Sequence, residues 1–147
     1  MHMQNEPKTM QQNPQYDFSP IDIFKILCEK IKVLLKLGVR ESNIVIDPGI
    51  GFGKNLSHNL EILNYLSLFH GLGVPILIGV SRKSLIADIT INGYKSLGIN
   101  KKIIDASNRL SGSISFAIHG YNNGIQIIRT HDVFETKQAI FCQESIS

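Results

Sequence analysis

Apolar residues along this chain follow two patterns, one typical of helices with a single buried face and one typical of short buried strands. Residues 1–18 are polar and predict a loop. Apolar side chains then recur at intervals of three and four, which predicts a helix that begins at Ser19 and ends at Gly38. Ser19 is expected to cap this helix, with Pro20 in its first turn and Asp22 completing a capping box.

Short apolar runs at residues 43–47, 74–80 and 124–133 each predict a strand. The first run is continuous, so its strand is expected to be buried on both faces. Helices are predicted between and after the strands, at residues 57–73, 107–119 and 134–145, whereas residues 85–105 are predicted to be mixed and rich in turns. Strands that alternate with helices at this spacing indicate parallel βα units and therefore an α/β fold.

Each predicted strand ends in polar residues that are capable of chemistry: "DPG", "SRKS" and "RTHD". In βα folds the ligand site forms at the carboxyl ends of the strands, so these residues are expected to meet there. Arg129 and His131 lie two positions apart and therefore point the same way, which predicts a seat for an anion. Asp132 then points elsewhere, and it is expected to cap the last helix.

The first of these motifs, "IVIDPGIGFGK", allows two interpretations. Asp-Pro-Gly is ordinary turn chemistry, and an aspartate at a strand end often bonds its own backbone. Alternatively, Asp47 is a buried carboxylate that accepts two hydrogen bonds from an amidine-like group of a ligand. The glycines match neither a P-loop nor a dinucleotide-binding fingerprint. They allow close approach of a flat ligand, against which Phe52 could lay its ring.

The second motif also allows a structural and a functional interpretation. Lys83 is either a surface lysine at the start of a helix or a functional cation, and the helix dipole disfavours a positive charge at that place. Ser84 either caps the same helix or lines a site. His58, His70 and His119 are expected to be ordinary surface or packing residues, because no Ser/His/Asp or metal-ligand spacing includes them.

Composition narrows the class of protein. With 147 residues and 43% hydrophobic residues, the chain is expected to form one globular domain. Its net charge of +3 is too small for the basic surface of a nucleic-acid-binding protein. Cys28 and Cys142 show no paired spacing and are expected to be reduced and packed. The sequence shows neither a run long enough to span a membrane nor a signal peptide, so a cytoplasmic protein without membrane contact is expected.

With these motifs in hand, the chain resembles the dihydropteroate synthase family. The matching pieces are "MHMQNEPKTMQ", "DPGIGFGKNLSHN", "GVSRKSLI", "RLSGSI" and "IIRTHDV", in the family's order. The family fold is a TIM (β/α)8 barrel, which needs roughly 250 residues. The resemblance therefore implies that residues 1–147 are the C-terminal half of such a barrel, from the end of the fifth strand to the eighth helix, with the N-terminal half absent.

The resemblance implies a transferase of folate biosynthesis, a sulfonamide target that is a homodimer as a complete enzyme. Its reaction condenses p-aminobenzoate with 6-hydroxymethyl-7,8-dihydropterin pyrophosphate, giving 7,8-dihydropteroate and pyrophosphate in the presence of Mg²⁺. The expected magnesium ligand lies in the missing half, so no metal ligand is predicted in this chain. The alternative is a non-catalytic half barrel, or a pterin- or phosphate-binding fragment that needs a complementary N-terminal half. Activity of this chain alone is not expected.

Site residues follow from the same resemblance. Asp47 is expected at the amino-pyrimidine edge of the pterin, and Lys83 at the pterin carbonyl and the p-aminobenzoate side; both are predicted to be catalytic. Arg129 and His131 are expected to hold the leaving pyrophosphate. The full set of predicted substrate-binding residues is Met1, Asp47, Phe52, Gly79, Lys83, Ser84, Arg129 and His131. Residues 90–105 form a longer connection than is usual in the family.

Overall fold

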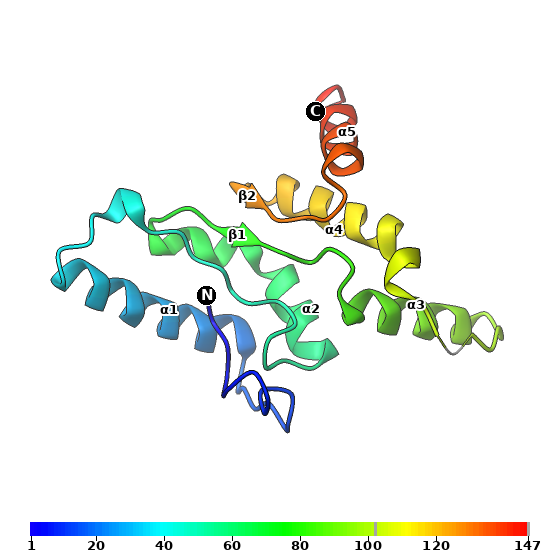
Figure 1. Ribbon diagram of the computed structural model, residues 1–147, viewed down its shortest axis with the longest axis horizontal. Helices are drawn as coiled ribbons and strands as arrows, with labels where there is room; N and C mark the ends of the chain where they lie inside the picture. Colours follow the sequence, from blue (N-terminus) through cyan, green and yellow to red (C-terminus); the bar gives the residue numbers. More distant parts are fainter. Residues whose placement is uncertain (102, 147) are drawn as a thin grey trace.

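The computed structural model describes residues 1–101 and 103–146. Figure 1 shows an open arrangement of helices beside a small sheet, with α1 at one side and α5 at the opposite side. The helices are α1 (Ser19–Lys36), α2 (Leu56–Asn64), α3 (Ser84–Ser96), α4 (Leu110–Asn122) and α5 (Val133–Glu144), and the strands are β1 (Leu77–Ile78) and β2 (Ile127–Ile128). Short 3-10 helices lie at η1 (Glu41–Asn43), η2 (Leu66–Leu72) and η3 (Ala106–Arg109).

The sheet is parallel, as the alternation of strands and helices predicts. β1 pairs with β2, with Leu77 opposite Ile127. On the other side of β1, Ile46 forms a parallel bridge to Ile76, so the segment that leads to Asp47 runs alongside the strands. The ladders are much shorter than the predicted strands, and residues 43–47 contribute this bridge rather than a full strand.

The prediction that residues 43–47 are buried on both faces is wrong. Ile44 and Ile46 are buried in the core, whereas Val45 between them is 46% exposed. Ile127 of β2 is also exposed. On the buried face, α1 contributes Ile23, Leu27 and Ile31 to the same core cluster as Ile44 and Ile46. The face that carries Val45 and Ile127 is exposed in the part of the chain that the structure describes.

The predicted end of the first helix is confirmed, but its predicted cap is not. Gly38 has a φ of 84°, and the amide of Val39 donates to the carbonyl of Leu34 at 3.1 Å, which closes the helix end. At the other end the cap position falls on Phe18, and no side chain caps it. Ser19 instead donates its hydroxyl to Glu61 Oε2 at 2.7 Å. Sequence alone gives no sign of that partner in α2.

Asp22 keeps half of its predicted role, because its carboxylate accepts hydrogen bonds from the amides of Asp17 and Phe18.

The next helix begins later in the prediction than in the structure. Asn55, rather than Ser57, caps α2, in a reciprocal capping box with His58. His58 is thus a local structural residue, in agreement with its predicted packing role.

Residues 84–96 form a regular helix, α3, where the sequence predicts a mixed, turn-rich segment. Leu85, Ile86 and Ala87 are buried at its start, so tertiary packing stabilises a helix that its turn-like residues do not predict. The helix of residues 107–119 is also shifted, because α4 begins at Leu110, after η3. The last helix, α5, agrees with its prediction.

Both cysteines are free, as predicted, but only Cys28 is partly buried, whereas Cys142 is exposed. Among residues 1–101 and 103–146, no helix combines the length and the apolar character needed to cross a membrane.

Candidate functional site

The polar ends of the parallel segments meet at one cavity, as the position of the three motifs predicts. Its volume is about 600 Å³. Five of the predicted site residues line it: Phe52, Gly79, Lys83, Arg129 and His131. The other lining residues are Ser81, Arg82, Ala106 and Thr130. Residues more than 70 positions apart in sequence are thereby brought to one place.

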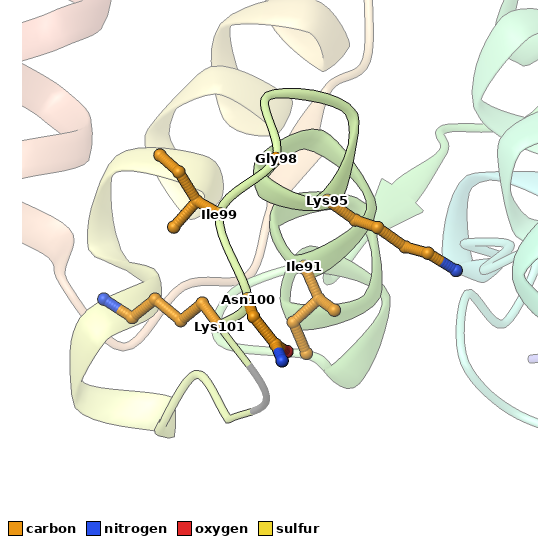
Figure 2. A pocket seen from close by; sticks show the side chains of 6 residues that line it. All are labelled: Ile91, Lys95, Gly98, Ile99, Asn100 and Lys101. Carbon is orange, nitrogen blue, oxygen red and sulfur yellow. The ribbon is translucent and has the colours of Figure 1, made fainter.

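A second cavity, of about 500 Å³, lies where α3 ends (Figure 2). It is lined only by the last turns of that helix and the loop that follows, including Lys95 and Lys101. Figure 2 shows the side chain of Lys95 extending from α3 and that of Lys101 extending from the loop, in different directions. No predicted site residue lines this cavity, so the cavity at the strand ends is the candidate site.

The contacts of Asp47 agree with both the structural and the functional interpretation of its sequence. Its Oδ1 accepts the amide of Gly49 at 2.7 Å, the turn contact expected of Asp-Pro-Gly. Its Oδ2 lies 3.8 Å from Nη2 of Arg129, in the direction of the cavity residues. The side chain is 13% exposed. One oxygen therefore fixes the turn while the other can still meet a ligand.

Lys83 is held in place rather than free on the surface. Its Nζ donates to the carbonyl of Ile50 and lies 4.4 Å from the centre of the Phe52 ring. Burial lowers the pKa of Lys83 to about 8, with Asp47 acting in the opposite direction and Arg129 in the same one. These contacts favour the functional interpretation of Lys83. Ser84, the first residue of α3, is exposed, makes no cap bond and does not line the cavity.

Arg129 occupies space that a glycine leaves open. A β-carbon on Gly79 would lie 2.8 Å from both Nε and Nη2 of Arg129, so a larger residue there would displace the guanidinium. His131 lies close by, with Nδ1 2.9 Å from the hydroxyl of Ser81. That hydroxyl accepts the amide of His131, so its own proton is available for Nδ1.

An ion pair that connects two of the loops at the strand ends was not predicted from the sequence. The guanidinium of Arg82 bonds both carboxylate oxygens of Asp132, and this contact lowers the pKa of Asp132. Asp132 occupies the cap position of α5 but makes no cap bond, so its predicted capping role is wrong. Arg82 has a φ of 57° and donates its amide to Ser113 at 2.9 Å. The ion pair joins the loop of Lys83 to the loop of His131.

Lys54 is a second residue that the sequence did not single out. It is buried, with 3% of its surface exposed. Its Nζ donates to the carbonyls of Gly49 and Phe52, at 2.8 Å each, and to Nδ1 of His2 at 3.0 Å. The signal that could have identified it is a charged residue directly after a glycine turn that follows a buried run.

Met1, a predicted substrate-binding residue, is 51% exposed and does not line the cavity. Its neighbour His2 donates its amide to the carbonyl of Asp47 at 2.9 Å, so the first residues lie beside the candidate site. Met1 is thus near the site but not part of its wall.

The charges around the cavity suit an anion better than a metal ion. Arg82, Lys83 and Arg129 all line it. Among the described residues no three or more His, Cys, Asp or Glu side chains gather in a way that could hold a metal ion. The residues present therefore do not fit a protein-bound Mg²⁺, but they do fit a phosphate-bearing ligand.

Comparison with known proteins gives consistent matches. The sequence profile of a family described as pterin binding enzyme matches residues 1–131. The dihydropteroate synthase of Escherichia coli (strain K12) is 41% identical over 140 residues, which are 95% of this chain and 45% of that protein. The crystal structure of the Yersinia pestis dihydropteroate synthase with a sulfonamide drug complex matches with a TM-score of 0.83 and 36% identity, over 99% of this chain and 48% of that one.

A further structural match is dihydropteroate synthase from Xanthomonas albilineans in complex with 7,8-dihydropteroate. Its TM-score is 0.80 and its identity 29%, over 90% of this chain and 47% of that chain. The chain thus spans about half the length of the relatives that it matches.

Proposed function

Because this chain belongs to the pterin-binding enzyme family, we propose that it supplies the C-terminal half of a dihydropteroate synthase. The proposed reaction condenses p-aminobenzoate with 6-hydroxymethyl-7,8-dihydropterin pyrophosphate. The amine nitrogen forms a bond to the methylene carbon, the C–O bond of that carbon breaks, and pyrophosphate leaves with the electron pair. The amine loses one proton, and 7,8-dihydropteroate is the product.

The observation that carries this proposal is the meeting of Lys83, Arg129 and His131 at one cavity, with Asp47 beside Arg129. A guanidinium and an imidazole at one wall offer hydrogen-bond donors to a pyrophosphate. Negative charge grows on that group as the C–O bond breaks, so donors fixed in advance lower the barrier. An anionic leaving group therefore matches the charge of this wall.

Asp47 and Lys83 are proposed to bind the pterin. Oδ2 of Asp47 would accept hydrogen bonds from the amino-pyrimidine edge, and its negative charge would favour positive charge on the ring during bond breaking. Nζ of Lys83 uses one donor on the carbonyl of Ile50, which leaves two for the pterin carbonyl. With a pKa of about 8, Lys83 remains mostly protonated at neutral pH.

The aromatic side of the cavity is proposed to receive p-aminobenzoate. Phe52 lines the cavity next to Lys83, so an apolar ring and a cation stand side by side there. That pair complements an aromatic carboxylate. Ser84 is also proposed to join this side of the site, and Met1 to join the pterin side, although both residues lie outside the cavity in this structure.

The proposed fold of the complete protein is a TIM barrel, to which this chain contributes the second half. The parallel order of the three sheet segments and the uncovered face at Val45 and Ile127 support it. We also propose that the complete enzyme is a homodimer and uses Mg²⁺. Because the described residues offer no metal site, a protein ligand for that ion would come from the part of the relatives that this chain does not cover.

A non-catalytic role is the second candidate, favoured by that same uncovered face. A cellular test separates the two. The chain is produced in a bacterial strain whose only other source of the enzyme is the first half of a dihydropteroate synthase. We expect growth without added folate products, and no growth with Lys83→Met. Growth that is absent with the unchanged chain, while both halves are soluble, would favour the non-catalytic role.

A further inference from the structure

Two buried polar side chains near the candidate site have no part in the proposed chemistry. Lys54 and His2 are 3% and 2% exposed, and neither lines the cavity. A buried ammonium is costly unless each of its donors finds an acceptor. The position of these acceptors shows what the lysine does.

All three donors of the Lys54 ammonium are used. Two of them reach the carbonyls of Gly49 and Phe52, and the third reaches Nδ1 of His2. The two carbonyls belong to the residues on either side of Ile50 and Gly51, so the ammonium bridges the two ends of this turn. The amide of Phe52 also donates to the carbonyl of Gly49, at 3.1 Å. Lys54 therefore fixes the shape of this turn.

The same turn presents two groups to Lys83. The carbonyl of Ile50 accepts a hydrogen bond from Nζ of Lys83, and the Phe52 ring lies 4.4 Å from that atom. A shift of the turn would move both groups. Lys54 does not reach the cavity, but it holds the residues that locate Lys83 within it.

His2 completes the arrangement because Nδ1 must be free of a proton in order to accept from Lys54. Burial, then the charge of Lys54, lower the pKa of His2 to about 3. Burial also lowers the pKa of Lys54 to about 7, with Asp47 opposing the shift. Near pH 7 His2 is therefore neutral, and its Nδ1 accepts a hydrogen bond from the protonated form of Lys54. The backbone adds to the fit, because a β-carbon on Gly49 would collide with the carbonyl of His2.

We propose that Lys54 is a positioning residue that, with His2 as its partner, fixes Phe52 and Lys83 on the p-aminobenzoate side of the cavity. This role rests on the proposed function. Arg129 and His131 belong to other loops, and Asp47 links Arg129 to this turn at 3.8 Å. Loss of the Lys54–His2 pair is therefore expected to affect Phe52 and Lys83 more than the pyrophosphate seat.

The kinetic test uses the assembled protein, meaning this chain combined with a segment that corresponds to the uncovered half of its relatives. Lys54→Met keeps length and apolar character but removes the three donors. We expect KM for p-aminobenzoate to rise about tenfold and kcat to fall, while the Kd for inorganic pyrophosphate stays within about twofold. Lys32→Met is the matched control, because Lys32 is exposed and contacts only Glu29 among the described charged residues. Equal changes in KM and in the pyrophosphate Kd would overturn the proposal.

A second measurement needs no turnover, so it separates failure of this role from failure of the proposed function. Hydrogen exchange of the Phe52 amide should be about tenfold faster with Lys54→Met, with β1 unchanged. If that variant does not fold, His2 provides the test. His2→Leu removes the acceptor and should also speed exchange at Phe52, whereas His2→Asn retains an acceptor oxygen and should restore protection. Unchanged exchange with His2→Leu would contradict the role, whether or not the wild type is active.

Discussion

A single side chain in this protein stabilises a turn and is also available to a ligand. Asp47 gives Oδ1 to the amide of Gly49 and directs Oδ2 toward Arg129. The structural and the functional interpretation of the sequence "DPG" are therefore compatible. Ser81 also has two roles: its hydroxyl accepts a hydrogen bond from the amide of His131, and it contacts Nδ1 of the same residue and so orients the ring. Local backbone contacts and ligand-facing atoms belong to the same residues here.

Asp47→Asn tests the ligand-facing oxygen with little change to the turn, because an amide oxygen can still accept from Gly49. We expect loss of a charge-assisted hydrogen bond to cost about 1.5–3 kcal/mol, or roughly ten- to a hundredfold in kcat/KM for the pterin substrate. Steady-state kinetics and a thermal unfolding midpoint on the assembled protein provide the measurement. An unchanged kcat/KM with an unchanged midpoint would remove Asp47 from the proposed site.

His2 predicts a dependence of stability on pH. Its pKa is lowered from 6.5 to about 3 by burial and by the charges of Lys54 and Lys30. Between these two values the unfolded chain binds more protons, so stability should rise as pH increases from about 3 to about 6.5. Each unit of pKa difference corresponds to about 1.4 kcal/mol. Thermal midpoints of wild type and His2→Asn should therefore differ in their pH dependence over this range, and parallel curves would contradict the burial of a neutral His2.

The position of Arg129 depends on the register in which β1 and β2 pair. The amide of Arg129, just beyond β2, donates to the carbonyl of Ile78 in β1, and this register carries the guanidinium across the end of β1. Gly79 stands at that crossing, where a side chain would meet Arg129. The pairing of two short strands thus decides where the guanidinium of Arg129 lies.

Gly79→Ala should weaken pyrophosphate binding by displacing Arg129, with little loss of fold stability. The expected change is about tenfold in the Kd for inorganic pyrophosphate, comparable with loss of one hydrogen bond to a charged group. Gly93→Ala is the matched control, since nothing lies within 4 Å of its β-carbon position. Calorimetric titration on the assembled protein gives both values, and equal affinities would mean that Arg129 does not bind the anion.

Features of the helices and strands that have a local cause could be predicted from the sequence, whereas features that depend on distant residues could not. The strand-end motifs and the stop at Gly38 were predicted because periodicity and backbone conformation are local properties. Caps were mispredicted where a polar side chain bonds a distant partner: Ser19 bonds Glu61, 42 residues away, and Asp132 bonds Arg82, 50 residues away. Lys54 was missed for the same reason, since His2 and the turn carbonyls identify it only in three dimensions.

The whole molecule exposes more surface than its size requires. Its accessible surface is 8845 Å², whereas a compact monomer of this mass exposes about 7,500 Å². Part of the excess is apolar, including Val45 and Ile127 on the sheet face opposite the helices. Parallel sheets are normally covered on both faces. The described residues therefore form an open surface that suits a further layer of protein.

The most direct test of this account combines size-exclusion chromatography with a pyrophosphate-release assay on the 147-residue chain, first alone and then with the first half of a related dihydropteroate synthase. The chain alone should associate or aggregate and release no pyrophosphate, because one face of its sheet is exposed and it spans only about half the length of its relatives. The mixture should elute as a defined complex and release pyrophosphate only when p-aminobenzoate is present, and Arg129→Ala should reduce that release. A monodisperse chain that is active by itself, or a stable complex that is inactive, would contradict the account.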